Sequence, residues 1–240
     1  MKGISIIVPI FNESKNISTL YSKLKKIKIR TKKEIIFVDD NSNDGSHIIL
    51  NNLKKKIRYI LRKEKKRDLM QSCFLGIKKS KFDTCIIMDG DLQHNPKYIN
   101  GLYNKFKKNF DLGICVRNFK IIKKEELSYF RKLMSLLIIF IINLILKKKT
   151  IDPLSGFFIF KKKIFFENRI KYYQKGYKIL LNILYCSKRK LKTFDKTIKF
   201  DSRSKDKSKL NLIVLIHLIF QIFFIFKNNL LNKFLGSEKL

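Results

Sequence analysis

The chain has 240 residues, of which 54 are Lys or Arg and 19 are Asp or Glu, so its formal net charge at pH 7 is +35. This length is enough for one domain with a sizeable core, and the sequence does not require a second domain. The positive charge is spread over every predicted helix and accompanies no nucleic-acid-binding motif. It therefore argues against nucleic acid as a partner and favours attraction to an anionic membrane surface.

The cysteines and the first residues bear on the cellular compartment. Cys73, Cys85, Cys115 and Cys186 show no Cys-x-x-Cys spacing, and three of them lie in apolar segments, so we expect buried, reduced thiols. Met1-Lys2-Gly3 leads directly into a predicted strand and not into the apolar core of a signal peptide. We therefore expect the folded domain to lie in the cytosol.

Polar turns follow each of the first two predicted strands. The strand at 4–8 runs into the turn at 9–13, and the strand at 34–38 runs into Asp39 and Asp40, with a helical pattern after each turn. Two adjacent acids repel each other unless they bind hydrogen-bond donors, such as a nucleobase N–H or ribose hydroxyls. The residues that follow are typical of turns and helix N-caps: Asn43, Asp44 and Ser46.

The next strand end carries the most informative pattern in the chain. The apolar run Cys85-Ile86-Ile87-Met88 leads into Asp89-Gly90-Asp91, which places two carboxylates at positions i and i+2. Such a run is typical of a parallel strand covered on both faces, and ligands of open α/β sheets gather beyond the carboxyl ends of these strands. The pattern indicates a Mg²⁺ or Mn²⁺ site completed by substrate phosphates. The alternative is an acidic turn that caps the next helix.

Two apolar segments follow in the second half of the chain. Residues 133–146 are too short to span a bilayer, which needs about 20 apolar residues, and a segment of this length is typical of an interfacial helix or a buried core helix. Residues 210–226 would reach about 25 Å as a helix. They either span a thinned membrane or lie in its plane with a narrow polar stripe, formed by His217, Gln221, Asn228 and Asn232.

Further motifs follow the strand ends in a fixed order. They are Arg117, Arg131 with Ser135, the run Asp152-Pro153-Leu154-Ser155-Gly156-Phe157, Gly176-Tyr177, and Phe200-Asp201-Ser202-Arg203 with Ser208-Lys209-Leu210. Together with the three strand ends, this series resembles the family-2 glycosyltransferases of the GT-A fold, and in particular the dolichol-phosphate or polyprenyl-phosphate sugar transferases. The resemblance covers nearly the whole chain.

The resemblance and the alternation of strand and helix signals predict the fold class. We expect an α/β protein, a three-layer α/β/α sandwich with a mostly parallel central sheet of the GT-A, nucleotide-diphospho-sugar transferase type. A GT-A domain is expected at residues 1–205, including an interfacial apolar helix at about 129–147. Residues 206–240 are expected to form a membrane-associated or transmembrane helix.

The resemblance also implies roles for individual residues. Asp89 and Asp91 would be catalytic, and Asp91 with Gln93 would bind the divalent cation, Mg²⁺ or Mn²⁺. The donor would be bound by Pro9, Phe11, Glu13, Val38, Asp40, Asp89, Gly90 and Asp91. The phosphate of the acceptor would be bound by Arg117, Arg131, Ser135, Arg203 and Lys209.

The implied reaction is a metal-dependent, inverting sugar transfer at the cytoplasmic face of the membrane. The donor would be a GDP- or UDP-linked sugar, and the acceptor a polyprenyl phosphate of the dolichyl type, used in cell-envelope glycan biosynthesis. Several residues depart from the family pattern: Asp68, Phe158, Asn182, Asp206 and Lys207. Two alternatives therefore stay open, a family-2 transferase that extends a cell-surface glycan and a catalytically degenerate, membrane-bound relative.

Overall fold

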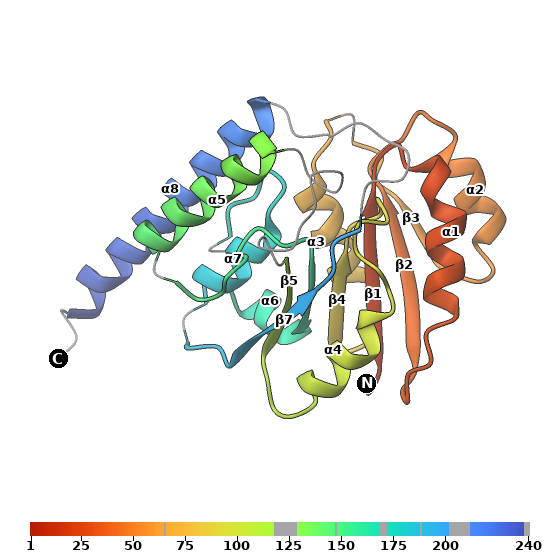
Figure 1. Ribbon diagram of the computed structural model, residues 1–240, viewed down its shortest axis with the longest axis horizontal. Helices are drawn as coiled ribbons and strands as arrows, with labels where there is room; N and C mark the ends of the chain where they lie inside the picture. The colour runs from red at the N-terminus through yellow and green to blue at the C-terminus, as the bar shows by residue number, and fades with distance from the viewer. Residues whose placement is uncertain are drawn as a thin grey trace.

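A computed structural model gives the structure of the chain, shown as a ribbon in Figure 1. It describes residues 1–64, 66–117, 129–146, 148–168, 172–187, 189–201 and 212–237, with side chains described from 132 in the first apolar segment and at 214–231 in the last helix. Three residues predicted to bind the acceptor phosphate lie outside the described side chains: Arg131, Arg203 and Lys209.

Strands and helices alternate through the first half of the chain, as the apolar runs between polar turns predict. The strands are β1 (Ile4–Ile10), β2 (Lys33–Asp39), β3 (Arg58–Leu61), β4 (Thr84–Met88), β5 (Leu112–Arg117), β6 (Phe157–Lys161) and β7 (Thr193–Ile198). The helices are α1 (Ser14–Lys25), α2 (Ser46–Leu53), α3 (Leu69–Lys79), α4 (Tyr98–Phe106), α5 (Tyr129–Leu146), α6 (Lys162–Asn168), α7 (Ile179–Tyr185) and α8 (Leu212–Ser237).

The strands form one sheet in the order β3-β2-β1-β4-β6-β5-β7. β1 pairs in parallel with β2 and β4, and β5 pairs in parallel with β7, whereas β6 is antiparallel to both of its neighbours. The carboxyl ends of β1, β2, β4 and β5 and the amino end of β6 therefore lie at one edge. The strand order reverses between β1 and β4, which is where open α/β sheets bind their ligands.

Helices cover both faces of this sheet and complete three layers. Successive residues of a strand point to opposite faces, so Ile4, Ile6 and Val8 pack with α1, α2 and α4, whereas Ile7 packs in the core that includes α3 and α5–α8. Burial of apolar side chains on both faces explains why the strands read as nearly continuous hydrophobic runs. The predicted α/β/α sandwich with a mostly parallel central sheet is confirmed.

Helices α5 and α8 lie side by side along one flank of the domain (Figure 1). Ile139 and Ile142 of α5 are buried, whereas Phe140 is 63% and Leu144 is 72% exposed. On α8, Phe223 is 69% exposed. The two helices therefore each bury one side and present an apolar second side, and we call this surface the α5/α8 apolar face. Its exposed members are Leu133, Leu136, Leu137, Phe140, Ile141, Leu144, Ile216, Ile219, Phe220, Phe223, Phe226, Leu230 and Leu231.

Two polar residues of α8, His217 and Gln221, face the protein. Gln221 is 1% exposed, and His217 is half-buried against the loop that contains Gly176. The polar stripe that the sequence predicts for an in-plane helix therefore contacts the domain at these two positions. Among the described residues, Val214–Leu231 is the one stretch that is long and apolar enough to cross a membrane by length and composition.

The four cysteines are buried and carry no disulfide, as the sequence predicts. Burial raises the pKa of the Cys85 thiol to about 12 and raises that of Cys73 and Cys115 well above the usual range. All three thiols are therefore protonated at neutral pH, which makes them apolar core residues and poor nucleophiles.

An ion cluster around Asp111 fixes the edge of the sheet opposite the polar turns. Asp111 accepts hydrogen bonds from Arg189 at 2.7 Å, Lys161 at 2.9 Å and the Lys192 N–H at 3.1 Å. The bonds from Arg189 hold the pKa of Asp111 well below its usual value, against the opposing effect of burial, and Lys161 adds to the lowering.

We expect Asp111→Asn to lower the free energy of unfolding by about 1–3 kcal/mol at pH 7, because it leaves Arg189 without its charged acceptor. Since the folded-state pKa is depressed, this contribution is present above the unfolded-state pKa and is lost as pH falls below about 4. Urea unfolding between pH 3 and 7 measures it. Glu167→Gln, at an exposed position, is the control; a difference from wild type that does not shrink on acidification contradicts the assignment.

Candidate active site

Strained turns mark the three strand ends at the reversal point of the sheet. Asn12 after β1, Asn41 after β2 and Leu92 after β4 have φ of 53°, 61° and 64°. This left-handed conformation costs about 1–2 kcal/mol in a residue with a Cβ atom, and for a branched side chain such as Leu it is unusual. Strain of this kind clusters at binding and catalytic sites, so the turn at 89–92 is a candidate site on geometry alone.

The turns after β1 and β2 are joined by side-chain hydrogen bonds. Ser42 Oγ accepts from Asn12 N–H at 2.9 Å, Ser46 Oγ accepts from Glu13 N–H at 3.1 Å, and Asp44 accepts from Ser14 N–H at 2.8 Å. The sequence predicts local capping of α2 by these residues. The structure shows both uses. Asp44 accepts from the Ser46 N–H at 3.0 Å at the start of α2, and Asp44 and Ser46 also satisfy N–H groups at the start of α1, which joins the two strand ends.

The residues predicted to bind the donor all lie at this edge. Pro9 and Val38 are buried in their strands, and the buried Glu13 carboxylate accepts a hydrogen bond of 2.6 Å from Asn16. Phe11 is half-buried, and the Arg67 guanidinium lies 4.3 Å from the centre of its ring. The β1 end therefore offers an aromatic surface already paired with a planar cation, which suits stacking with a nucleobase.

Asp40 lies at the centre of a second group of contacts. Its carboxylate is paired with Arg62 and accepts a 2.7 Å hydrogen bond from the Asp68 N–H. Asp68 in turn caps α3 by accepting from Met70 N–H at 2.9 Å, and it accepts from Gly176 N–H at 3.2 Å. Asp68, which departs from the family pattern, therefore connects α3 to the 172–178 loop.

A cavity of about 330 Å³ opens beside this group. Arg62, Arg67 and Asp68 line one side, and Gly176, Tyr177 and His217 of α8 line the other. Within the described residues, Arg67 Nε and His217 Nδ1 are buried and have no hydrogen-bond partner. The cavity therefore presents two buried polar atoms at the edge of the predicted nucleoside pocket, and it has a size that small-ligand pockets commonly have.

The acidic turn at 89–91 is packed closely against its neighbours. A Cβ atom on Gly90 would lie 2.8 Å from the Ile10 side chain, and one on Gly156 would overlap the Asp89 carboxylate. His94 Nε2 lies 3.8 Å from Asp89 Oδ2. Burial lowers the pKa of His94 to about 4, although the charge of Asp91 acts in the opposite direction, so His94 is neutral at pH 7. The Asp89 carboxylate is therefore confined by a glycine and a neutral imidazole.

Arg117, at the end of β5, forms a two-pronged ion pair with Asp152. Its Nε and Nη2 donate to the two carboxylate oxygens at 2.7 and 2.8 Å, and its backbone N–H donates at 3.2 Å. Burial alone would raise the pKa of Asp152, but the Arg117 charge holds it below its usual value. The nearby Ser155 hydroxyl donates to the Cys115 carbonyl at 2.6 Å. The Asp152–Gly156 run is thereby fixed against β5 and next to Asp89.

Comparison with known proteins agrees with this arrangement. The sequence model described as Glycosyl transferase family 2 matches residues 5–168, more than half of the chain. The chain belongs to glycosyl transferase family 2. It is 31% identical over 210 residues to the dolichol-phosphate mannosyltransferase of Pyrococcus furiosus, covering 86% of this chain and 59% of that protein. It is 32% identical over 190 residues to that of Saccharomyces cerevisiae, covering 75% and 69%.

The chain thus spans about three fifths of the length of the Pyrococcus furiosus relative. Among solved structures, glucosyl-3-phosphoglycerate synthase of Mycobacterium tuberculosis in complex with uridine diphosphate superposes with a TM-score of 0.68, at 14% identity, over 92% of this chain and 80% of that one. A second complex of that synthase, with Mn²⁺, uridine diphosphate and its product, gives 0.66. This glycosyltransferase therefore has the GT-A fold.

The charges at the site of this family 2 glycosyltransferase suit a divalent cation. The site contains three carboxylates, those of Asp89, Asp91 and Asp152. It contains two cations, Arg117 and Lys178, whose charges interact with these carboxylates and with each other. Asp89, Asp91 and Gln93 belong to one turn and carry oxygen atoms of the kind that Mg²⁺ and Mn²⁺ accept when substrate phosphates supply the remaining ligands. In the described part of the chain, no three His, Cys, Asp or Glu side chains form a metal site by themselves.

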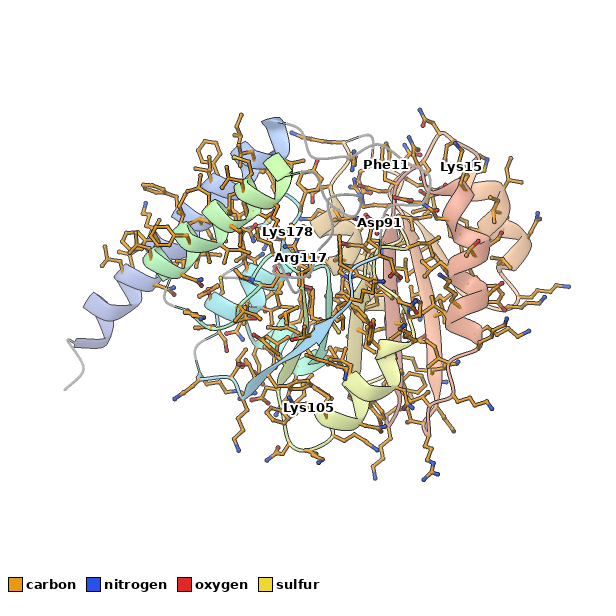
Figure 2. The ribbon with its side chains drawn as sticks, viewed as in Figure 1. Phe11, Lys15, Asp91, Lys105, Arg117 and Lys178 are labelled. Atoms are coloured by element: carbon orange, nitrogen blue, oxygen red, sulfur yellow. The ribbon has the colours of Figure 1, made fainter. Side chains whose placement is uncertain are left out.

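The acceptor side of the site is described only in part. Arg117 lies at the same edge as Asp91 (Figure 2), although two of its donors are held by Asp152. Ser135 is half-buried on the second turn of α5. The Asp201 N–H donates to the Gln93 carbonyl at 3.0 Å. The chain that leads towards Arg203 is thus attached to the predicted metal-binding turn.

Sequence reasoning missed two residues of the site. Lys178 follows the recognised Gly176-Tyr177 pair, but one lysine among 54 basic residues carries no sequence signal. His94 belongs to the acidic motif, yet only the structure shows that its ring lies between Phe157 and Phe200, with ring centres 5.6 and 5.3 Å away. The sequence offers one indication of this packing, an aromatic residue at both 157 and 200.

We expect Gly156→Ala to weaken binding of a nucleoside diphosphate in the presence of Mn²⁺ by about 10-fold or more, because the added methyl group displaces the Asp89 carboxylate. Titration calorimetry with GDP and UDP measures the dissociation constant. Gly101→Ala is the matched control, since a Cβ there meets only the flexible end of Lys196. Equal affinity of Gly156→Ala and wild type would show that the Asp89 position is not critical.

Proposed function

We propose that this protein is a metal-dependent, inverting glycosyltransferase that moves one sugar from a GDP- or UDP-linked donor to a polyprenyl phosphate at the cytoplasmic face of the membrane. Residues 1–205 would form the transferase domain and residues 206–240 a membrane-associated helix. The observation that carries the proposal is that one domain contains both the acidic turn, at the edge of its sheet, and the apolar helices α5 and α8, which share its core. The names of the dolichol-phosphate mannosyltransferase relatives support the acceptor class.

The donor half of the proposal follows from the strand ends. The nucleoside would lie near Pro9, Phe11, Glu13, Val38 and Asp40, with its base stacked in the region of Phe11 and Arg67. The cavity beside Asp40 and Asp68 offers room for polar groups of the base. The diphosphate would then extend along the β1/β4 reversal point towards Asp89, Gly90 and Asp91, where the sheet topology favours a ligand.

The acceptor half follows from the chemistry of a lipid phosphate. A phosphate monoester already carries its nucleophilic oxygen as an anion near neutral pH, so the site needs to position it and does not need a strong base. This oxygen forms a bond to the anomeric carbon from the side opposite the donor. The bond from that carbon to the diphosphate oxygen breaks, and its electron pair leaves with the nucleoside diphosphate, which inverts the anomeric centre.

Charge on the departing diphosphate must be stabilised during this step. Asp91 and Gln93 would hold the divalent cation, with Asp89 beside them, and a bound Mg²⁺ or Mn²⁺ would supply electrostatic stabilisation of that charge. Cations of the chain would orient the acceptor phosphate by hydrogen bonding: Arg117, Arg131, Arg203 and Lys209, with the Ser135 hydroxyl.

The α5/α8 apolar face would bring the enzyme to its lipid substrate. It is a large exposed apolar surface of a kind that soluble monomers rarely show, and it belongs to a chain with a net charge of +35. Because α8 packs against α5 and α7 and turns Gln221 inward, the in-plane arrangement accounts for its polar stripe better than an isolated spanning helix does. Each basic residue near an anionic leaflet would add about 1 kcal/mol.

The glycan-extending alternative would need a carboxylate base near the acceptor. Asn182 occupies the position where the family often has an acid, and its side chain is fully buried and hydrogen-bonded to Tyr173 and Gln221. It therefore faces the protein interior. This contact favours the lipid-phosphate acceptor, which needs no such base.

We expect membranes that contain the protein to transfer label from a radioactive nucleotide sugar to an organic-extractable product when Mn²⁺ is present. Asp91→Ala should reduce this transfer by about 100-fold or more, because the charge on the leaving diphosphate is no longer stabilised. Asp83→Ala, at an exposed acid far from the site, is the control and should retain activity. Label that appears only in water-soluble glycan favours the alternative, and no transfer from any donor contradicts enzymatic activity.

We expect the double variant Phe140→Glu/Phe223→Glu to bind vesicles containing anionic lipid at least about 10-fold more weakly than wild type. Each change removes a large exposed aromatic side chain from the α5/α8 apolar face and adds a charge. Liposome flotation at two salt concentrations measures the partition. Ile48→Glu, at an exposed apolar residue of α2, is the control. Unchanged flotation of the double variant would contradict membrane docking through this face.

A further inference from the structure

Lys178 lies inside the acidic centre of the site. Figure 2 shows it close to Arg117 and to one side of Asp91. Its charge interacts with those of Asp89, Asp152 and Asp91, and with one cation, Arg117. Although burial lowers the pKa of Lys178, the attraction of Asp89 opposes this effect.

Within the described residues, one hydrogen-bond acceptor holds the Lys178 ammonium group. Its Nζ donates to the Leu154 carbonyl at 2.9 Å, within the run that ends at Gly156 beside Asp89. An ammonium group has three N–H donors, so this bond orients the group and leaves capacity for a ligand. A lysine with this placement is suited to bind an oxygen of a phosphate that approaches the acidic turn.

A hydrogen bond connects Lys178 to the apolar helix α8. Gln221 Nε2 donates to the Lys178 carbonyl at 2.8 Å and to Asn182 Oδ1 at 3.2 Å. Asn182 in turn donates to the Tyr173 carbonyl at 2.9 Å. Gln221 therefore holds one end of the loop at Lys178 directly and the other end at Tyr173 through Asn182. A buried glutamine in an apolar helix is costly unless it is hydrogen-bonded, and these are the partners that satisfy it.

We propose that Lys178 is a further substrate-contacting residue that binds a phosphate oxygen during sugar transfer, and that Gln221 of α8 is a positioning residue that holds it there. The seating of α8 against the domain is thereby part of the active site. This inference rests on the proposed function. The phosphate belongs either to the departing nucleoside diphosphate or to the lipid acceptor. A change of Lys178 should affect nucleotide binding in the first case and the Michaelis constant for the acceptor in the second.

The first experiment measures GDP and UDP binding with Mn²⁺ by calorimetry, and the Michaelis constant for polyprenyl phosphate in detergent. Lys178→Met should weaken one of the two by about 10-fold or more: the dissociation constant if it contacts the diphosphate, the Michaelis constant if it contacts the acceptor. Lys178→Arg should restore part of the loss. Lys163→Met, at an exposed lysine of α6, is the matched control.

The second experiment tests the positioning role with a double-mutant cycle. Gln221→Leu keeps the volume of the side chain but removes both hydrogen bonds, and it should lower the same parameter as Lys178→Met by several-fold. In the Lys178→Met background the same change should have little further effect, since Gln221 acts through Lys178. A purely structural role of Gln221 would instead give additive losses in both backgrounds.

The outcomes separate this inference from the proposed function. If wild type binds a nucleoside diphosphate and transfers sugar, but folded Lys178→Met matches it in both constants, Lys178 does not contact substrate and the inference is wrong. Additive effects of Gln221→Leu would overturn the positioning role. If wild type neither binds a nucleoside diphosphate nor transfers sugar, the proposed function itself fails. Thermal unfolding of each variant identifies any loss that is due to misfolding.

Discussion

The buried ion pair between Arg117 and Asp152 is the constraint on which the rest of the site depends. It joins the end of β5 to the run that returns into β6, and it brings Gly156 against the Asp89 carboxylate. A buried pair contributes little net stability over apolar residues, but removal of one partner leaves an uncompensated charge. The pair therefore sets a geometry more than it stabilises a fold. Its rigidity confines Asp89 beside the neutral His94.

A second set of contacts connects this centre to the α5/α8 apolar face. Lys178 contacts the Leu154 carbonyl on one side, and its own carbonyl receives Gln221 of α8 on the other. Asp68 holds the same loop from the side of α3 through Gly176. The loop is thus bonded to the 152–156 run, to α3 and to α8, so that the candidate site and the apolar helix form one packed unit. An enzyme of this kind would couple its contact with a bilayer to the order of its site.

Much of the site could be predicted because parallel strands bring their carboxyl ends together. The turns at Phe11, Asp40 and Asp91 are far apart in sequence but necessarily share one edge once β1, β2 and β4 pair. Prediction was weaker where a polar residue has two equally local uses. Asp44 and Ser46 read as caps of their own helix, but they also bond to the start of α1, and Asp68 reads as a departure from the family pattern but caps α3 and binds Gly176.

The sequence by itself determined the order of strands and helices, the acidic edge of the sheet, the buried thiols and the apolar character of α5 and α8, because these follow from hydrophobic period and from residue types at strand ends. Only the tertiary structure decided which way the polar residues of α8 face, what Arg117 binds, and that Lys178 enters the site. Such contacts depend on packing between segments that are distant in the chain, so hydrophobic pattern and turn residues do not predict them.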